Sequence, residues 1–184
     1  MGDKELIKIV PVTSGPEYDD IQATFHRNLP LSRIIKIERI QNKTLYHGYQ
    51  TLKKKYEVEN PQMRNEVDGL WHGTAAGSVD GINKSGFNCS YCGKNATAFG
   101  EGVYFARDIQ YSANDVYSTP DHHGIKKIYK CSVLVGRMMQ GQHGLKVLQD
   151  SYNSAVNNIR RPSIYVIFHD SHAYPNYLIT FSNH

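Results

Sequence analysis

Hydrophobic residues in the first third of the chain repeat with two different spacings. Residues 6–12 and 35–38 alternate between apolar and polar side chains, a pattern that predicts half-buried strands. Between these segments, apolar side chains recur every three or four residues, at Tyr18, Ile21, Phe25 and Leu29. This spacing predicts a helix, which Ser14 can cap and Pro30 ends. A second helix is expected after Asn42, with one apolar face formed by Leu45, Tyr49, Leu52 and Tyr56.

From Leu70 onward, the predicted elements become shorter. Strands are predicted at residues 70–72, 103–105, 129–135, 163–168 and 177–181, and short helices near residues 78–84 and after Asp108. The run 163–168 is apolar without alternation, which indicates a strand buried on both faces. Many short strands with interspersed helices, and no regular strand–helix–strand repeat, favour a single α+β domain that covers residues 1–184.

The composition is that of a globular domain. The 184 residues are 40% hydrophobic and 21% charged, enough for one core. The formal net charge of +4 permits a phosphate-bearing ligand but is too small to imply nucleic-acid binding. No apolar run is long enough to span a bilayer, so a membrane partner is not expected. Three cysteines, an odd number, argue against a disulfide scaffold and for a reducing compartment.

The motifs for metal binding are incomplete. Cys89 and Cys92 form a single C-x-x-C, but a structural zinc site needs four ligands and no second pair has zinc-finger spacing. Cys131 lies in a predicted strand and is expected in the core. The adjacent His122 and His123 are expected at the exposed tip of a hairpin. The sequence therefore predicts no metal site.

Three segments share the features of a site for a flat aromatic cation beside a ribose. Trp71-His72-Gly73-Thr74 ends a predicted strand with a glycine, which lets backbone groups approach a planar ligand, while the imidazole offers a partner to a ribose hydroxyl. The segment 100–106 begins with glycines and projects an aromatic ring from the following strand. The segment 111–117 supplies a hydroxyl group, Ser112, and a second ring, Tyr117. Two tyrosines could hold a nicotinamide ring between them, with Ser112 bonded to its carboxamide.

Each segment also has an ordinary structural interpretation. A histidine before a glycine is more often structural than catalytic, Tyr104 in a short strand is usually a core residue, and Tyr117 is usually a loop anchor. The functional interpretation therefore depends on finding all three segments together, in this order and at this spacing.

These segments, with several others, resemble those of one known family. The matching runs are Ile37-Glu38-Arg39-Ile40-Gln41-Asn42, Leu70-Trp71-His72-Gly73-Thr74, Gly86-Phe87-Asn88, Cys92-Gly93-Lys94-Asn95-Ala96, Gly102-Val103-Tyr104-Phe105-Ala106-Arg107, Tyr111-Ser112, residues 162–168 and residues 173–181. Across essentially its whole length, the chain resembles the catalytic domain of the poly(ADP-ribose) polymerase family, the diphtheria-toxin-like ADP-ribosyltransferases. It is most similar to the macrodomain-linked mono-ADP-ribosylating members. The resemblance implies two packed, mostly antiparallel sheets that form a cleft, with flanking helices.

The family is known for a His-Tyr-Glu triad, and two of the three triad residues have a match in this chain. The resemblance implies that His72 orients ribose hydroxyls and that Tyr104 stacks on nicotinamide. Ile164 stands where the family has a glutamate that polarises a ribose hydroxyl and allows chain elongation. The absent carboxylate implies transfer of single ADP-ribose units.

The resemblance also implies which residues bind the two ends of NAD+. At the nicotinamide end, the backbone of Gly73 clamps the carboxamide, Ser112 is its side-chain partner and Tyr117 is the second stacking ring. Towards the adenosine end lie Thr74 and Asn88. Residues 88–97 match the loop that covers the NAD+ site.

Within that covering loop, Tyr91 is expected to be a lid side chain. The resemblance further implies NAD+ as co-substrate, no metal, and protein acceptors that can include the chain itself. Benzamide-type compounds, which copy nicotinamide, are expected to compete with NAD+. The family resemblance also implies a location in the nucleus, the cytoplasm or both.

We therefore expect an NAD+-dependent mono-ADP-ribosyltransferase, and two alternatives remain open. One is a non-catalytic module that binds NAD+ or ADP-ribose. The presence of His72, Tyr104, Ser112 and Tyr117 argues against it. The other is transfer to phosphorylated nucleic-acid ends, which the mild positive charge permits but does not imply.

Overall fold

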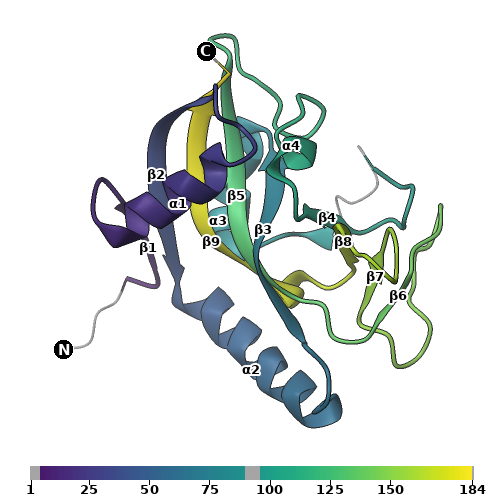
Figure 1. Cartoon of the computed structure of the whole chain (residues 1–184). Coiled ribbons are helices and arrows are strands. Elements are labelled where there is room, and N and C mark those ends of the chain that lie inside the picture. The colour runs from purple at the N-terminus through teal and green to yellow at the C-terminus, as the bar shows by residue number, and fades with distance from the viewer. Residues whose placement is uncertain (1–4, 90–95, 184) are drawn as a thin grey trace.

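The computed structural model describes residues 5–89 and 96–183, and its strands form one nine-stranded sheet (Figure 1). In spatial order the strands are β1 (Ile7–Pro11), β2 (Arg33–Asn42), β9 (Ala173–Ser182), β5 (Ile125–Leu134), β3 (Glu66–Thr74), β4 (Val103–Ala106), β8 (Ile164–Ile167), β7 (Ser154–Val156) and β6 (Met138–Gln140). Neighbouring strands are antiparallel except β6 and β7, which are parallel.

The sheet consists of two parts joined at a narrow point. β3 and β4 share one residue pair, Trp71 with Ala106, whereas β3 pairs with β5 along most of its length and β4 with β8 along all of it. We call β1-β2-β9-β5-β3 the large part and β4-β8-β7-β6 the small part; Figure 1 shows them as two groups of strands. The expected α+β class and mostly antiparallel pairing are confirmed. The two expected sheets correspond to these two parts, which that single pair joins into one hydrogen-bonded sheet.

Polar side chains cap the N-termini of two helices, at the residues where the sequence predicts these helices to begin. The described helices are α1 (Pro16–His26), α2 (Lys43–Glu59), α3 (Val79–Ser85) and α4 (Ile109–Ser112), with 3-10 turns η1 (Ala76–Ser78) and η3 (Asp170–His172). Asn42 caps α2 and Asp108 caps α4, each through a side-chain oxygen that accepts a backbone N–H, at 3.1 and 2.9 Å. The expected cap by Ser14 is wrong. Gly15 occupies that position with φ of 89°, and no side chain caps α1.

Helices cover both faces of the large part. Leu70 and Trp71 are neighbours on β3, so their side chains point to opposite faces, and both are buried. The Trp71 face packs against α1 and α4, in a cluster that includes Ile21, Phe25, Ile109, Ile128 and Phe181. The Leu70 face packs against α3, in a cluster that includes Ile82, Phe87, Phe105, Tyr129 and Cys131. The C-terminal end of β3 thus emerges from between two buried layers.

Several expected absences concern only part of the chain. No helix within residues 5–89 and 96–183 is long and apolar enough to cross a membrane. Over the same residues, no three histidine, cysteine, aspartate or glutamate side chains come close enough to hold a metal ion. Cys131 is buried as expected and Cys89 is half-buried, but Cys92 lies outside the described residues. His122 and His123 are exposed in the turn before β5, as expected.

Candidate active site

His72 is held by the backbone of the neighbouring strand. Its Nδ1 lies 2.8 Å from the carbonyl oxygen of Tyr104, and its ring packs against Phe87 and Phe105, with centroids 4.8 and 5.3 Å away. Burial among these groups lowers the pKa of His72 to about 4, so the ring is neutral at physiological pH. A carbonyl oxygen only accepts, so Nδ1 must carry the proton and Nε2 the lone pair. The structure therefore leaves Nε2 as an acceptor suited to a ribose hydroxyl.

Packing requires a glycine at position 73. A Cβ at this position would collide with the carbonyl oxygen of Ser112 and lie 2.7 Å from Oγ of Ser118. Only a glycine lets the segment after α4 lie this close to β3. The same close approach brings Ser112 next to β3, where its Oγ donates to the carbonyl oxygen of Trp71 at 2.9 Å.

The backbone of Gly73 faces an edge at which β4 gives it no partner. Residues two apart in a strand direct their N–H and C=O groups to the same edge. The Trp71 carbonyl points towards Ser112, so the Gly73 groups point the same way, beyond the last pair with β4. An N–H and a C=O side by side match the acceptor and donor of a primary carboxamide. The buried hydroxyl of Ser112 lies at the same edge, where it donates to the carbonyl of Trp71 and keeps its lone pairs for a further donor.

Tyr104 has a structural task in this arrangement. Its ring is 8% exposed and packs with Met139, Ala155 and Val166 in the small part of the sheet. Its hydroxyl donates to the carbonyl of Gly100 at 2.7 Å and accepts from a backbone N–H at 3.0 Å. The ring thus anchors the residues that precede β4, and its stacking on nicotinamide stays a prediction.

Tyr111 is a site residue that the sequence interpretation did not assign. It lies on α4, and its ring stacks on that of Tyr117 with centroids 4.9 Å apart and planes inclined by 26°. The two hydroxyls are 2.9 Å apart. Burial raises the pKa of Tyr111 well above its usual range, so its hydroxyl stays neutral. Since Tyr111 covers one face of the half-buried Tyr117 ring, a ligand ring can stack only on the other face.

Ile164 opens β8 directly opposite Ala106 of β4. Its side chain lies on the same face as Tyr104, because Tyr104 pairs with Val166, and it packs against the same cluster. Burial on both faces was expected for this strand. It holds for residues 165–167, whereas Ile164 is only half-buried. An aliphatic side chain therefore stands at the position where the family has a glutamate, on the same face as Tyr104.

The remaining predicted residues are less closely joined to this group. Thr74 is buried at the end of β3, and its hydroxyl lies 3.4 Å from the carbonyl of Ala75. Asn88 is exposed, and Tyr91 lies outside the described residues. A cleft of about 580 Å³ occurs between α2 and η3, but none of the predicted site residues lines it. The structure thus brings together His72, Gly73, Tyr104, Ser112 and Tyr117.

Comparisons with known proteins show the family to which the chain belongs. Residues 16–157, more than half of the chain, match the model of the poly(ADP-ribose) polymerase catalytic domain. Protein mono-ADP-ribosyltransferase PARP14 from Homo sapiens is 45% identical over 96% of this chain and 10% of its own length. For the Mus musculus enzymes PARP10 and PARP12, the identities are 38% and 37%, over 92% and 95% of this chain and 19% and 25% of theirs. The chain thus spans a quarter or less of these relatives. It belongs to the poly(ADP-ribose) polymerase catalytic domain family.

Proposed function

We propose that this domain is an NAD+-dependent mono-ADP-ribosyltransferase, which moves one ADP-ribose from NAD+ to a protein side chain and releases nicotinamide. The observation that carries the proposal is the combination of a fixed, neutral His72 on β3 with an aliphatic Ile164 on β8, the two strands on either side of β4. The relatives named as mono-ADP-ribosyltransferases support it.

The residues present fit the nicotinamide end of NAD+. The backbone of Gly73 would hold the carboxamide, with the oxygen of Ser112 as a further acceptor. The free face of Tyr117 would carry the ring, and aromatic stacking of this kind contributes about 0.5–1.5 kcal/mol beyond the area buried. Nε2 of His72 would accept a ribose hydroxyl and so fix the sugar relative to the ring.

The chemistry that follows is cleavage of a glycosidic bond. The bond between the anomeric carbon and the nicotinamide nitrogen breaks, and its electron pair leaves with neutral nicotinamide. The ribose then resembles an oxocarbenium ion, as in glycoside hydrolysis. An acceptor oxygen forms the new bond at the anomeric carbon and, if it is a hydroxyl, loses its proton. The domain contributes mainly orientation, which can remove about 7–11 kcal/mol of the barrier when two reactants must meet.

Ile164 removes one source of help in that step. A carboxylate at this position could stabilise positive charge on the ribose or polarise a hydroxyl, and an aliphatic chain does neither. An acidic side chain on the acceptor could supply the charge itself. A second ADP-ribose offers no such group, so transfer would stop after one unit.

Intact-mass measurement after incubation with NAD+ tests the proposal. We expect mass increments of one ADP-ribose unit per modified site, on an added acceptor or on the chain itself. Ladders of linked units would overturn the mono-transfer assignment. Binding of NAD+ without any mass increment would favour a non-catalytic binding module. If added 5′-phosphorylated RNA gains the ADP-ribose mass and the protein acceptor gains less, nucleic-acid ends would be favoured as acceptors.

A further inference from the structure

Lys126 is buried in a position where a charge is not expected. Its side chain is 3% exposed on β5, among the apolar residues under α1 and α4. Removing an ammonium group from water is costly unless it is paired and hydrogen-bonded. Its Nζ lies 5.4 Å from the centroid of the Phe181 ring and donates to two oxygen atoms. These two atoms indicate what the buried charge does.

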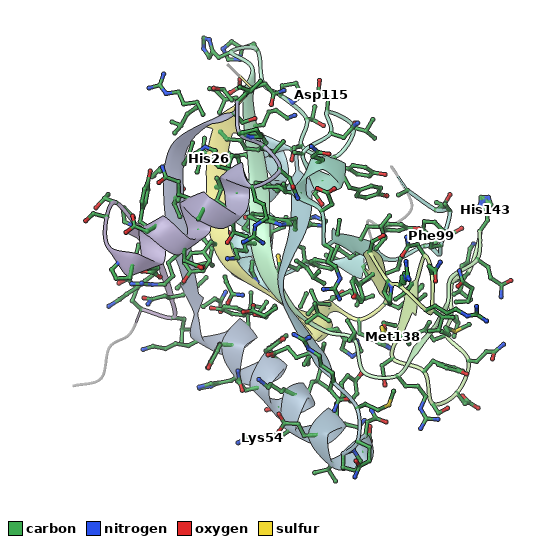
Figure 2. All side chains as sticks on the ribbon, in the orientation of Figure 1. His26, Lys54, Phe99, Asp115, Met138 and His143 are labelled. Atoms are coloured by element: carbon green, nitrogen blue, oxygen red, sulfur yellow. The ribbon has the colours of Figure 1, made fainter. Side chains whose placement is uncertain are left out.

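Both oxygen atoms belong to the turn that follows α4. One is the carbonyl oxygen of Ala113, and the other is Oδ1 of Asp115, 2.7 Å from Nζ. Tyr117 follows two residues after Asp115. The ammonium group thus joins β5 to the first half of the turn that carries the second stacking ring. Figure 2 shows Asp115 beside α4 at the edge of the molecule, on the opposite side of the fold from Lys54 of α2.

Other bonds hold the second half of the same turn. Oγ of Ser118 donates towards the carbonyls of Ser112 and Lys127, at 2.9 and 2.8 Å. The N–H of Tyr117 donates to the carbonyl of Asn114 at 2.9 Å. Lys126 is the only charged side chain in this set that is buried, and Asp115, its partner, is 69% exposed. These bonds lie within the turn or reach it at Ser118, whereas Lys126 ties its first half, at Ala113 and Asp115, to β5.

We propose that Lys126 is a positioning residue for Tyr117, acting through Ala113 and Asp115 to place the ring against which nicotinamide stacks. The inference rests on the proposed function, because it assigns Tyr117 a part in binding. It adds a residue that lies behind the site and touches no part of the ligand. The buried charge is thereby explained by the turn it holds, not by the stability of the sheet alone.

A matched pair of lysine variants tests the inference. Lys126→Met keeps length and removes the charge. Lys130→Met is the control, because Lys130 lies on the same face of the same strand, is 14% exposed and also pairs with an exposed aspartate, Asp20 of α1. We expect Lys126→Met to raise the Kd for benzamide about tenfold, a typical coupling for residues joined in one network. Lys130→Met should leave that Kd unchanged. Equal effects of the two variants would overturn the proposal.

A double-mutant cycle separates positioning from general loss of structure. In a Tyr117→Ala background, Lys126→Met should raise the Kd no further, because the ring it positions is gone. A full additional loss would contradict the inference. If Lys126→Met fails to fold, Asp115→Asn, at an exposed position, replaces it in the cycle. An unchanged Kd for Asp115→Asn in the wild-type background would contradict the inference. Wild type that binds no benzamide would instead contradict the proposed function.

Discussion

Nδ1 of His72 lies 2.8 Å from the main-chain oxygen of Tyr104, so the first two residues of the expected triad are joined through backbone and not through the tyrosine ring. The bond depends on the path of β4 and fixes both the orientation and the tautomer of the imidazole. Because the carbonyl remains when the side chain at position 104 is changed, the histidine and the tyrosine can be altered independently.

We expect His72→Asn to slow transfer strongly while the domain stays folded. The asparagine amide can replace Nδ1–H as a donor to the Tyr104 carbonyl but offers nothing at the position of Nε2. Transfer from labelled NAD+ should fall about a hundredfold, a typical loss for misplaced reactants. His72→Ala is the comparison, because it also opens a space between Phe87 and Phe105 and should melt at a lower temperature. Full activity in His72→Asn would show that Nε2 has no part in the reaction.

Acid should destabilise the domain through two buried histidines. Burial lowers the pKa of both His72 and His172 to about 4, and His172 is further bonded to the hydroxyl of Tyr56 at 2.8 Å. Below about pH 6.5 the unfolded chain binds protons at these residues, while the folded chain does not until about pH 4. Protons therefore favour unfolding, and stability should be complete above pH 6.5 and fall towards pH 4, by up to about 3 kcal/mol per histidine. Unfolding in urea at several pH values measures this, and His72→Asn should show a shallower fall.

Gly73→Ala should destabilise the domain more than a small surface change would. The new Cβ would meet the Ser112 carbonyl and the Ser118 hydroxyl, so either β3 or the segment after α4 must move. Overpacking of this kind costs about 1–3 kcal/mol. Gly77→Ala is the control, since a Cβ there would have no neighbour within 4 Å. Equal urea midpoints for the two variants would mean that the close approach at Gly73 is not maintained in solution.

The features that could be predicted from the sequence depend mostly on local chain chemistry. The caps at Asn42 and Asp108 and the strand that carries His72 each follow from a few adjacent residues. Lys126 could not be predicted as buried, because Lys127 follows it directly and the pair shows no apolar–polar alternation that would assign either lysine to a covered face. Only the packing of α1 and α4 over that face shows that it is covered. The pairing of Tyr111 with Tyr117 likewise depends on the short length of α4, which ends at Ser112.

The strands β6 and β7 were not predicted either. Each has three residues, too few to show a period, and they pair in parallel across a stretch of turns. Their burial comes from the small part of the sheet, in which Ala155 and Met139 pack against Tyr104. A strand that is stabilised by partners distant in sequence leaves little local signal.

Tyr117→Ala should weaken the binding of benzamide by about 1–2 kcal/mol, from lost stacking and lost apolar burial. Calorimetry with the folded variant gives the value. Tyr111→Phe is the control, because it keeps the stacked pair and removes only the bond between the two hydroxyls, so its effect should be smaller. An unchanged affinity in Tyr117→Ala would mean that another residue forms the second face of the nicotinamide site.

Ile164→Glu should not by itself create a polymerase. Elongation needs a group that polarises a ribose hydroxyl and also an acceptor groove that holds an earlier ADP-ribose, and the substitution supplies at most the first. The variant should fold, because Ile164 is the half-buried first residue of β8, whereas a charge at the fully buried Val166 would be far more costly. With a carboxylate beside the ribose and water as the available acceptor, release of free ADP-ribose should rise. A product assay that resolves free ADP-ribose, single units and chains measures this, with Ile164→Gln as the uncharged control. Chains formed by Ile164→Glu alone would show that the acceptor groove is already competent, and that Ile164 sets the limit of one unit.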